Sequence, residues 1–289
     1  MTNRPVPEGK FADIGGNLRV HYHEQGEGDV VLFLHGSGPG ASGWSNFREN
    51  YPYVAEHGFR ALVPDTLGYG YSSQPSDVDY TLDFLLDRLE RFLAVMGVSA
   101  CSVIGNSHGG AMAIGLALRR PELVKKLVLM APGGLEERET YMKMEGIRAM
   151  MKAFLSPDGI TREAMRTVFG HQLYDPSLVT DALIEERYSI AKEQPERVLT
   201  SMQVPHLAPE LSKITCPVFG LWGMDDKFCP VSGAHTLARS CARSRVLLLS
   251  RCGHWVMVEH RDVFNRLTVD FLREASLAHG RRRDRAPRR

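Results

Sequence analysis

The sequence predicts an α/β fold in which a mostly parallel, doubly wound sheet carries an all-helical insertion between two of its strands. Three observations support this prediction. Short, continuous apolar runs, such as residues 30–34 and 245–249, are typical of strands that are buried on both faces. Helix-like segments alternate with these runs, which implies right-handed crossovers between parallel strands. The alternation stops at about residue 135 and resumes near residue 211.

The amino-terminal elements follow in order along the chain. Residues 11–14 and 18–24 alternate between apolar and polar side chains around a Gly-Gly-Asn turn at 15–17, which predicts a hairpin. After the hairpin we expect strands at 30–34, 60–64, 100–104 and 127–130, and helices at 44–57, 81–96 and 110–119.

The second half of the chain contains the insertion and the end of the sheet. Residues 135–211 have a helix-like pattern throughout, and strands at 216–222 and 245–249 follow, with helices at 232–241 and 262–275. We therefore expect a core of residues 1–134 and 211–289, a helical lid of residues 135–210, and a flexible basic tail at 276–289. Ligands bind at the carboxyl edge of such sheets, so the lid is expected to cover that edge.

Composition and charge exclude several classes of function. The chain has 289 residues, is 43% hydrophobic and carries a formal net charge of +1, so we expect no nucleic-acid partner. The basic run at 281–289 fits a solvated terminus better than a binding patch. No apolar run is long enough to span a bilayer. The chain has five cysteines but no Cys-x-x-Cys pair and no signal peptide, which indicates a soluble, cytoplasmic protein. As a partner we expect a small-molecule substrate.

The strongest motif is Gly-Asn-Ser-His-Gly at residues 105–109, which matches the Gly-x-Ser-x-Gly nucleophile elbow. It lies between an expected buried strand and an expected helix, where a sharp turn exposes the serine at the helix amino terminus. The glycines at 105 and 109 leave room for that turn. Because the helix dipole and free backbone N–H groups favour negative charge there, Ser107 is the candidate nucleophile.

A serine needs a base to take its proton and an acid to orient that base. The base is expected to be His254, since it follows a buried strand in Cys-Gly-His-Trp at 252–255. The acid is Asp225 or Asp226, which also follow a strand, and the pattern Gly-x-x-Asp-x-x-x-Pro favours Asp226. The chain order Ser, Asp, His is that of the α/β-hydrolases.

An oxyanion hole requires two N–H donors that point at one position. The backbone of His108, directly after the nucleophile, is expected to supply one of them. The loop His-Gly-Ser-Gly-Pro-Gly at 35–40 is expected to supply the other, from Ser37 or Gly38, with Gly36 and Gly38 permitting a close backbone approach. The ring of His108 either lines the pocket or packs in the core, and the sequence leaves both interpretations open.

Several motifs together resemble those of the meta-cleavage product hydrolases, which are carbon–carbon bond hydrolases of aromatic and steroid ring degradation. These motifs are His-Gly-Ser-Gly-Pro-Gly at 35–40, Trp-Ser-Asn at 44–46, Gly-Asn-Ser at 105–107, Cys-Gly-His-Trp at 252–255 and Glu-His at 259–260. The resemblance extends over residues 10–275, roughly. The two asparagines, combined with Cys-Gly-His-Trp, are far more selective than the triad alone.

The resemblance implies a set of substrate-binding residues. Asn46 and Asn106 correspond to asparagines at the polar end of the pocket. Arg187 corresponds to a lid arginine that binds the carboxylate end of the substrate, and its planar fork suits a 2-oxo-carboxylate. Without the resemblance, Arg187 would be interpreted as a surface helix residue. Trp255 and Phe228 correspond to aromatic pocket residues, whereas the first half of the lid shows no obvious aromatic wall.

The resemblance also implies an activity, namely hydrolysis of a carbon–carbon bond in a 2-hydroxy-6-oxo-hexa-2,4-dienoate. Ketonisation of the dienol would precede attack by the serine, and the products would be a 2-hydroxypenta-2,4-dienoate and a carboxylic acid. We expect no metal or organic cofactor, and a homodimer or higher homo-oligomer. The alternatives are an esterase or lactonase with the same triad, and a non-catalytic protein that binds a small ligand.

Overall fold

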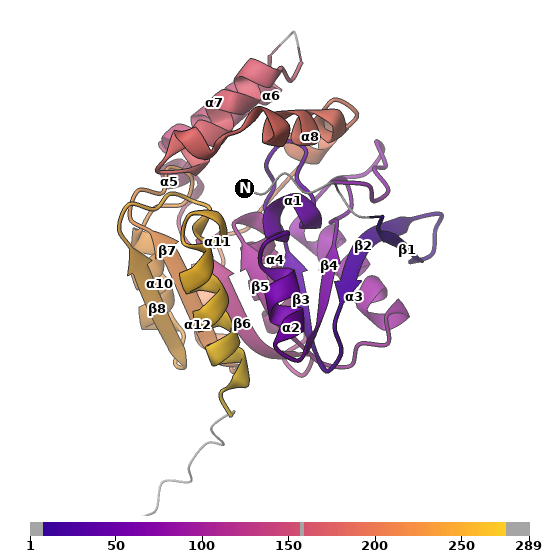
Figure 1. The fold of residues 1–289 in the computed structure, drawn as a ribbon, viewed down its shortest axis with the longest axis vertical. Helices are drawn as coiled ribbons and strands as arrows, with labels where there is room; N and C mark the ends of the chain where they lie inside the picture. Colours follow the sequence, from indigo (N-terminus) through magenta and orange to yellow (C-terminus); the bar gives the residue numbers. More distant parts are fainter. Residues whose placement is uncertain (1–7, 157–158, 276–289) are drawn as a thin grey trace, which may run out of the picture.

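An eight-stranded sheet runs through residues 8–156 and 159–275, which are the residues that the computed structural model describes (Figure 1). The strand order is β1-β2-β4-β3-β5-β6-β7-β8, and every neighbouring pair from β4 to β8 is parallel. The strands are β1 (Lys10–Asp13), β2 (Arg19–Gln25), β3 (Asp29–Leu34), β4 (Phe59–Pro64), β5 (Cys101–Asn106), β6 (Val124–Met130), β7 (Val218–Gly223) and β8 (Ser244–Leu249). The expected hairpin is present as β1 and β2.

Helices cover both faces of the sheet, which makes the fold doubly wound. Along β3, Leu32 and Leu34 face one hydrophobic cluster, while Val31 and Phe33 face the other. The first cluster contains α3 (Leu82–Val95), α4 (His108–Arg119) and α10 (Ser232–Ser240). The second contains α1 (Gly43–Phe47), α2 (Tyr51–Glu56), α11 (Val256–Glu259) and α12 (Arg261–Arg273). The continuous apolar runs of the sequence follow from this two-sided burial.

The sequence analysis was wrong about one helix in this layer. It predicted a single helix over residues 44–57, but the structure has α1 and α2, separated around Asn50. Pro52 has no N–H for a helix that continues from α1, and it lies in the first turn of α2, where that loss costs nothing. The Asn50 side chain meanwhile bonds the Met257 carbonyl and Asn265.

The chain between β6 and β7 contains only helices. These are α5 (Arg138–Tyr141), α6 (Glu145–Phe154), α7 (Arg162–Gln172), α8 (Asp181–Ala191) and α9 (Arg197–Thr200), with short 3-10 turns η1 (Pro176–Leu178) and η2 (Ala208–Lys213). Figure 1 shows α5 to α8 beyond the carboxyl ends of the parallel strands. The segment therefore lies over the edge where ligands bind in such folds.

Two further expectations concern the rest of the chain. None of the described helices is both long and apolar enough to cross a membrane. The basic tail expected at 276–289 lies outside the described residues.

Candidate active site

Ser107 lies between β5 and α4 in a strained backbone conformation. Its φ is 55° and its ψ is −117°, a region that residues other than glycine rarely adopt. A Cβ on Gly105 would lie 2.5 Å from the Gly109 carbonyl oxygen, and one on Gly109 would lie 2.1 Å from the Leu34 carbonyl oxygen. Only glycines fit at these two positions, and the turn has the geometry of a nucleophile elbow.

His254 and Asp226 form a buried pair in the loops that follow β8 and β7. The Nδ1 atom of His254 lies 2.7 Å from the Oδ2 atom of Asp226, and both side chains are almost fully buried. The other carboxylate oxygen, Oδ1, accepts N–H bonds from Phe228 at 2.7 Å and Cys229 at 2.9 Å. These bonds hold the carboxylate in a fixed orientation toward the imidazole.

The structure distinguishes between the two neighbouring acids. Asp225 is exposed, and its Oδ2 accepts a bond of 3.3 Å from the Cys252 N–H. Asp226 is the one that contacts the imidazole of His254. The pattern that favoured Asp226 in the sequence thus selects the acid that is paired here.

The glycines of the loop after β3 differ in how closely other parts of the protein approach them. A Cβ on Gly36 would lie 3.2 Å from the Asn106 Oδ1, which is tight, but one on Gly38 would make only ordinary contacts at 3.6 Å. The tightest position is Gly40, with φ at +59° and a built Cβ only 1.9 Å from the Arg187 carbonyl oxygen. Gly40 therefore sets how closely α8 packs on the loop.

Gly40→Ala is expected to destabilise the protein by about 3 kcal/mol, since it adds a left-handed backbone penalty of about 1 kcal/mol to severe overpacking against α8. It should also lower kcat/KM, because α8 carries Arg187. Urea denaturation and steady-state kinetics measure both effects. Gly16→Ala is a matched control, because Gly16 has φ at +66° but no neighbouring atom within 4 Å of a built Cβ. Equal destabilisation by the two variants would contradict the steric role of Gly40.

Arg187 is a buried residue of α8 and not a surface residue. It is only 1% exposed, and its Nη1 atom donates to the Ser45 hydroxyl at 2.8 Å and to Asn46 Oδ1 at 3.3 Å. The guanidinium lies 5.0 Å from the ring centroid of Phe169 and 5.3 Å from that of Trp255. Helix α8 thus places a cation between two aromatic rings and the amide of Asn46.

The charge of Arg187 lacks a carboxylate partner among the described residues. The neighbouring Glu186 pairs instead with Arg48, at 2.6 Å. Within residues 8–156 and 159–275, the Nε atom of Arg187 has no hydrogen-bond partner, and burial lowers the pKa of the guanidinium to about 9. A buried cation without an anion is costly, so the site favours binding of an anionic group.

The other expected substrate-binding residues surround the same region. The Asn106 amide donates to the carbonyl oxygens of Met130 at 3.3 Å and His254 at 3.4 Å, while its buried Oδ1 has no partner. Phe228 stacks on the His254 ring with centroids 5.1 Å apart. All of these residues, together with Trp255, line one cavity.

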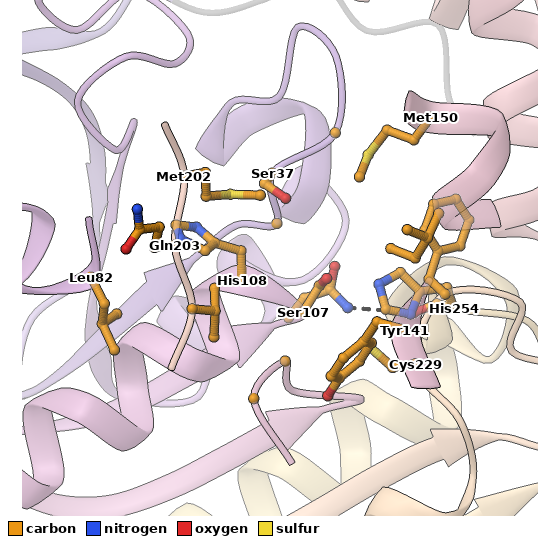
Figure 2. Close-up of a pocket in the computed structure, with 18 of the residues that line it drawn as sticks. Ser37, Leu82, Ser107, His108, Tyr141, Met150, Met202, Gln203, Cys229 and His254 are labelled. Atoms are coloured by element: carbon orange, nitrogen blue, oxygen red, sulfur yellow. Dashed lines mark hydrogen bonds between the residues drawn. The ribbon is translucent and has the colours of Figure 1, made fainter. Parts of the chain in front are cut away.

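That cavity has a volume of about 830 Å³, and residues of the insertion, such as Met150 and Arg187, line it together with residues that follow the strands. Ser37, Gly38, Ser107, His108 and His254 line it. Figure 2 shows Ser107 between two groups of side chains: His254, Cys229 and Tyr141 on one side, and His108, Met202, Gln203 and Leu82 on the other. The sequence-predicted site residues thus line one cavity, except Asp226, which lies behind His254 and bonds its Nδ1 atom.

Sequence reasoning missed Gln172, at the end of α7. Its carbonyl oxygen accepts the N–H of His254 at 2.7 Å and that of Trp255 at 3.3 Å, and its side chain lines the cavity. It also missed Cys229, a buried thiol that interacts with Ser107 and whose pKa burial raises well above the usual range. No sequence pattern indicates Gln172, since it lies in a lid helix far from any strand end.

Comparisons with known proteins agree with this geometry. The family described as the alpha/beta hydrolase fold matches residues 29–261. A 2-hydroxy-6-oxononadienedioate/2-hydroxy-6-oxononatrienedioate hydrolase of Comamonas testosteroni is 36% identical over 266 residues, 89% of this chain and 92% of that protein. A 2-hydroxy-6-oxo-6-phenylhexa-2,4-dienoate hydrolase of Burkholderia cepacia is 36% identical over 267 residues, with coverage of 89% and 92%.

Solved structures give the same result. A meta-cleavage product hydrolase from Pseudomonas fluorescens IP01, solved as a variant complexed with acetates, has a TM-score of 0.81 and is 30% identical. The match covers 91% of this chain and 97% of that one. The chain is thus a member of the α/β-hydrolase fold family. Within that family, it belongs to the meta-cleavage product hydrolases, the 2-hydroxy-6-oxo-dienoate hydrolases that act on carbon–carbon bonds.

Proposed function

We propose that this protein hydrolyses the carbon–carbon bond between C5 and C6 of a 2-hydroxy-6-oxo-hexa-2,4-dienoate, in the degradation of aromatic compounds. The products are a 2-hydroxypenta-2,4-dienoate and a carboxylic acid. The observation that carries the proposal is Arg187, a buried guanidinium without a carboxylate partner among the described residues, which lines the same cavity as Ser107 and His254. An ester hydrolase has no need of such a group.

In the proposed reaction, Arg187 binds the carboxylate of the substrate, and Asn46 and Asn106 bond its polar end. The dienol first ketonises, which provides an electron sink for the carbon leaving group. Ser107 then attacks the C6 carbonyl carbon while His254 takes the hydroxyl proton, and Asp226 stabilises the resulting imidazolium. The oxyanion accepts the His108 backbone N–H and that of Ser37 or Gly38.

Bond cleavage follows from this intermediate. The C5–C6 bond breaks, and its electron pair moves into the ketonised chain. The imidazolium of His254 then donates a proton, which gives the 2-hydroxypenta-2,4-dienoate. A water molecule, deprotonated by His254, then hydrolyses the acyl group from Ser107 and releases the carboxylic acid. The burial of His254 and Asp226 keeps this proton transfer away from bulk water.

Arg187→Gln tests the proposal against the esterase alternative. It removes a charge-assisted contact worth roughly 2–4 kcal/mol in a desolvated site, so kcat/KM on a dienoate should fall by about two to three orders of magnitude. The loss on p-nitrophenyl acetate should be at least about tenfold smaller, because a neutral ester has no carboxylate to bind. Absorbance of the dienoate and of p-nitrophenolate measures the two rates.

Arg187→Lys serves as the matched variant for this test. It keeps the charge but loses the planar fork, so its rate on the dienoate should lie between those of the wild type and Arg187→Gln. Equal losses on both substrates would indicate a general defect of the site. No loss on either substrate would favour the esterase alternative.

Three further proposals accompany this function. Residues 135–210 act as a lid domain, which the position of α5 to α8 over the strand ends supports. The protein works in the cytoplasm, which its five free cysteines favour. It forms a homodimer or a higher homo-oligomer, and sedimentation of the purified protein tests this.

A further inference from the structure

We propose that the ring of His108 forms a binding subsite for a neutral hydrogen-bonding group on the C6 substituent of the substrate. The inference rests on the proposed carbon–carbon hydrolysis, and it specifies the substrate class within it. It concerns the side chain of His108 alone, because the backbone N–H of this residue belongs to the oxyanion hole. The expected substituent is a hydroxyl-bearing aryl group.

The ring of His108 is buried and has an unused hydrogen-bonding atom. The residue is 4% exposed and lines the cavity, and its Nε2 atom has no partner among the described residues. A buried polar atom without a partner lowers stability, so such atoms are normally paired. The orphaned Nε2 in the wall of a substrate cavity indicates that a bound molecule supplies the missing partner.

The position of the ring identifies which part of the substrate it meets. Arg187 contacts Ser45, Asn46 and the rings of Phe169 and Trp255, and these contacts define the carboxylate end of the cavity. Figure 2 shows His108 on the other side of Ser107 from His254, together with Leu82, Met202 and Gln203. With the carboxylate at Arg187 and C6 at Ser107, the substituent on C6 extends toward His108.

The ring of His108 is uncharged at neutral pH, so it does not attract an anionic substituent. Burial lowers the pKa of His108 to about 4, so only about one molecule in a thousand carries a protonated ring at pH 7. Three carboxylates, those of Asp83, Glu136 and Glu137, and the guanidinium of Arg138 also line the cavity, and Glu137 pairs with His206 at 2.9 Å. A neutral imidazole offers a hydrogen bond to a hydroxyl or carbonyl group, but it offers no charge to a carboxylate.

An unsubstituted phenyl group fits this wall less well. It would cover the ring and exclude water from it, but it would leave Nε2 without a partner. Loss of one hydrogen bond to a buried polar group corresponds to a rate ratio of about 10 to 100. The exposed residue Gln203, which lines the cavity on the same side of Ser107, carries a second polar side chain there.

The experiment compares kcat/KM for dienoates that differ only at C6. The substituents are phenyl, its three monohydroxyphenyl isomers, and the carboxyethyl group of 2-hydroxy-6-oxonona-2,4-dienedioate. We expect at least one hydroxyphenyl isomer to exceed the phenyl compound by about tenfold or more. We also expect the dienedioate to be the slowest. A phenyl compound equal to or better than all three isomers overturns the inference, as does a preference for the dienedioate.

Variants of His108 separate this subsite from other causes of the preference. His108→Leu should reduce the hydroxyphenyl-to-phenyl ratio to about one, whereas His108→Asn, which keeps a donor and an acceptor, should retain part of it. His235→Leu is the control, because His235 is an exposed histidine of α10 outside the cavity. An unchanged ratio in His108→Leu overturns the inference alone. Failure of every dienoate, with ester hydrolysis intact, overturns the proposed function as well.

Discussion

Ser107→Ala is expected to lower kcat on a dienoate by at least about 10⁴-fold, and His254→Ala by a similar factor. The two residues act as one unit, since a hydroxyl without its base is a poor nucleophile and a base without the hydroxyl has no proton to take. Turnover is measured from the loss of visible absorbance of the dienoate. Binding should survive in Ser107→Ala, because Arg187, Asn46 and Asn106 remain.

Cys229→Ala provides the control for this experiment. Cys229 interacts with Ser107 and is the other nucleophilic side chain close to it, but burial raises the pKa of its thiol and keeps it protonated. Its removal should therefore change kcat by less than about tenfold. A variant pattern in which Cys229→Ala is inactive and Ser107→Ala is active would refute the serine mechanism.

Asp226→Asn is expected to lower kcat by about 10⁴-fold, the size of effect seen when a triad acid becomes an amide. The amide cannot stabilise the imidazolium of His254, and its N–H₂ group opposes the Nδ1–H tautomer. Both Oδ1 contacts, to the Phe228 and Cys229 N–H groups, require an acceptor, so the amide nitrogen must then face His254.

Asp225→Asn should stay within a few-fold of the wild-type kcat. The exposed Asp225 uses one carboxylate oxygen to accept the Cys252 N–H, and an asparagine keeps such an oxygen. Kinetics of the two variants, with melting temperatures to monitor folding, decide between the acids. The reverse order of damage would make Asp225 the orienting acid.

The parts of the site that could be predicted from the sequence lie at strand ends. Ser107, Asp226 and His254 each follow a buried apolar run, and parallel strands bring their carboxyl ends to one edge whatever the lid does. Arg187 was identified only through its resemblance to a family, because α8 alone has the composition of a surface helix. Its burial depends on the loop at Gly40, which packs against the Arg187 backbone although the two residues are more than a hundred positions apart in the sequence.

The parts that could not be predicted depend on contacts between segments that carry no local pattern. Pro52 is a local signal for the break between α1 and α2, but the bonds of Asn50 to Met257 and Asn265, more than two hundred residues later in the chain, have no such signal. The sequence did not decide whether the ring of His108 packs in the core or lines the cavity, because the neighbouring residues do not determine where the ring lies. The structure places it in the cavity wall.

The bond from the His254 N–H to the Gln172 carbonyl has a consequence for any movement of α7. Glu259 adds to it, because its carboxylate accepts the N–H groups of Tyr174 and Gly253 and so ties the end of α7 to the loop of the base. Lifting α7 would remove the backbone support of His254. Any movement of α7 away from the sheet would therefore also loosen the loop that holds the catalytic base.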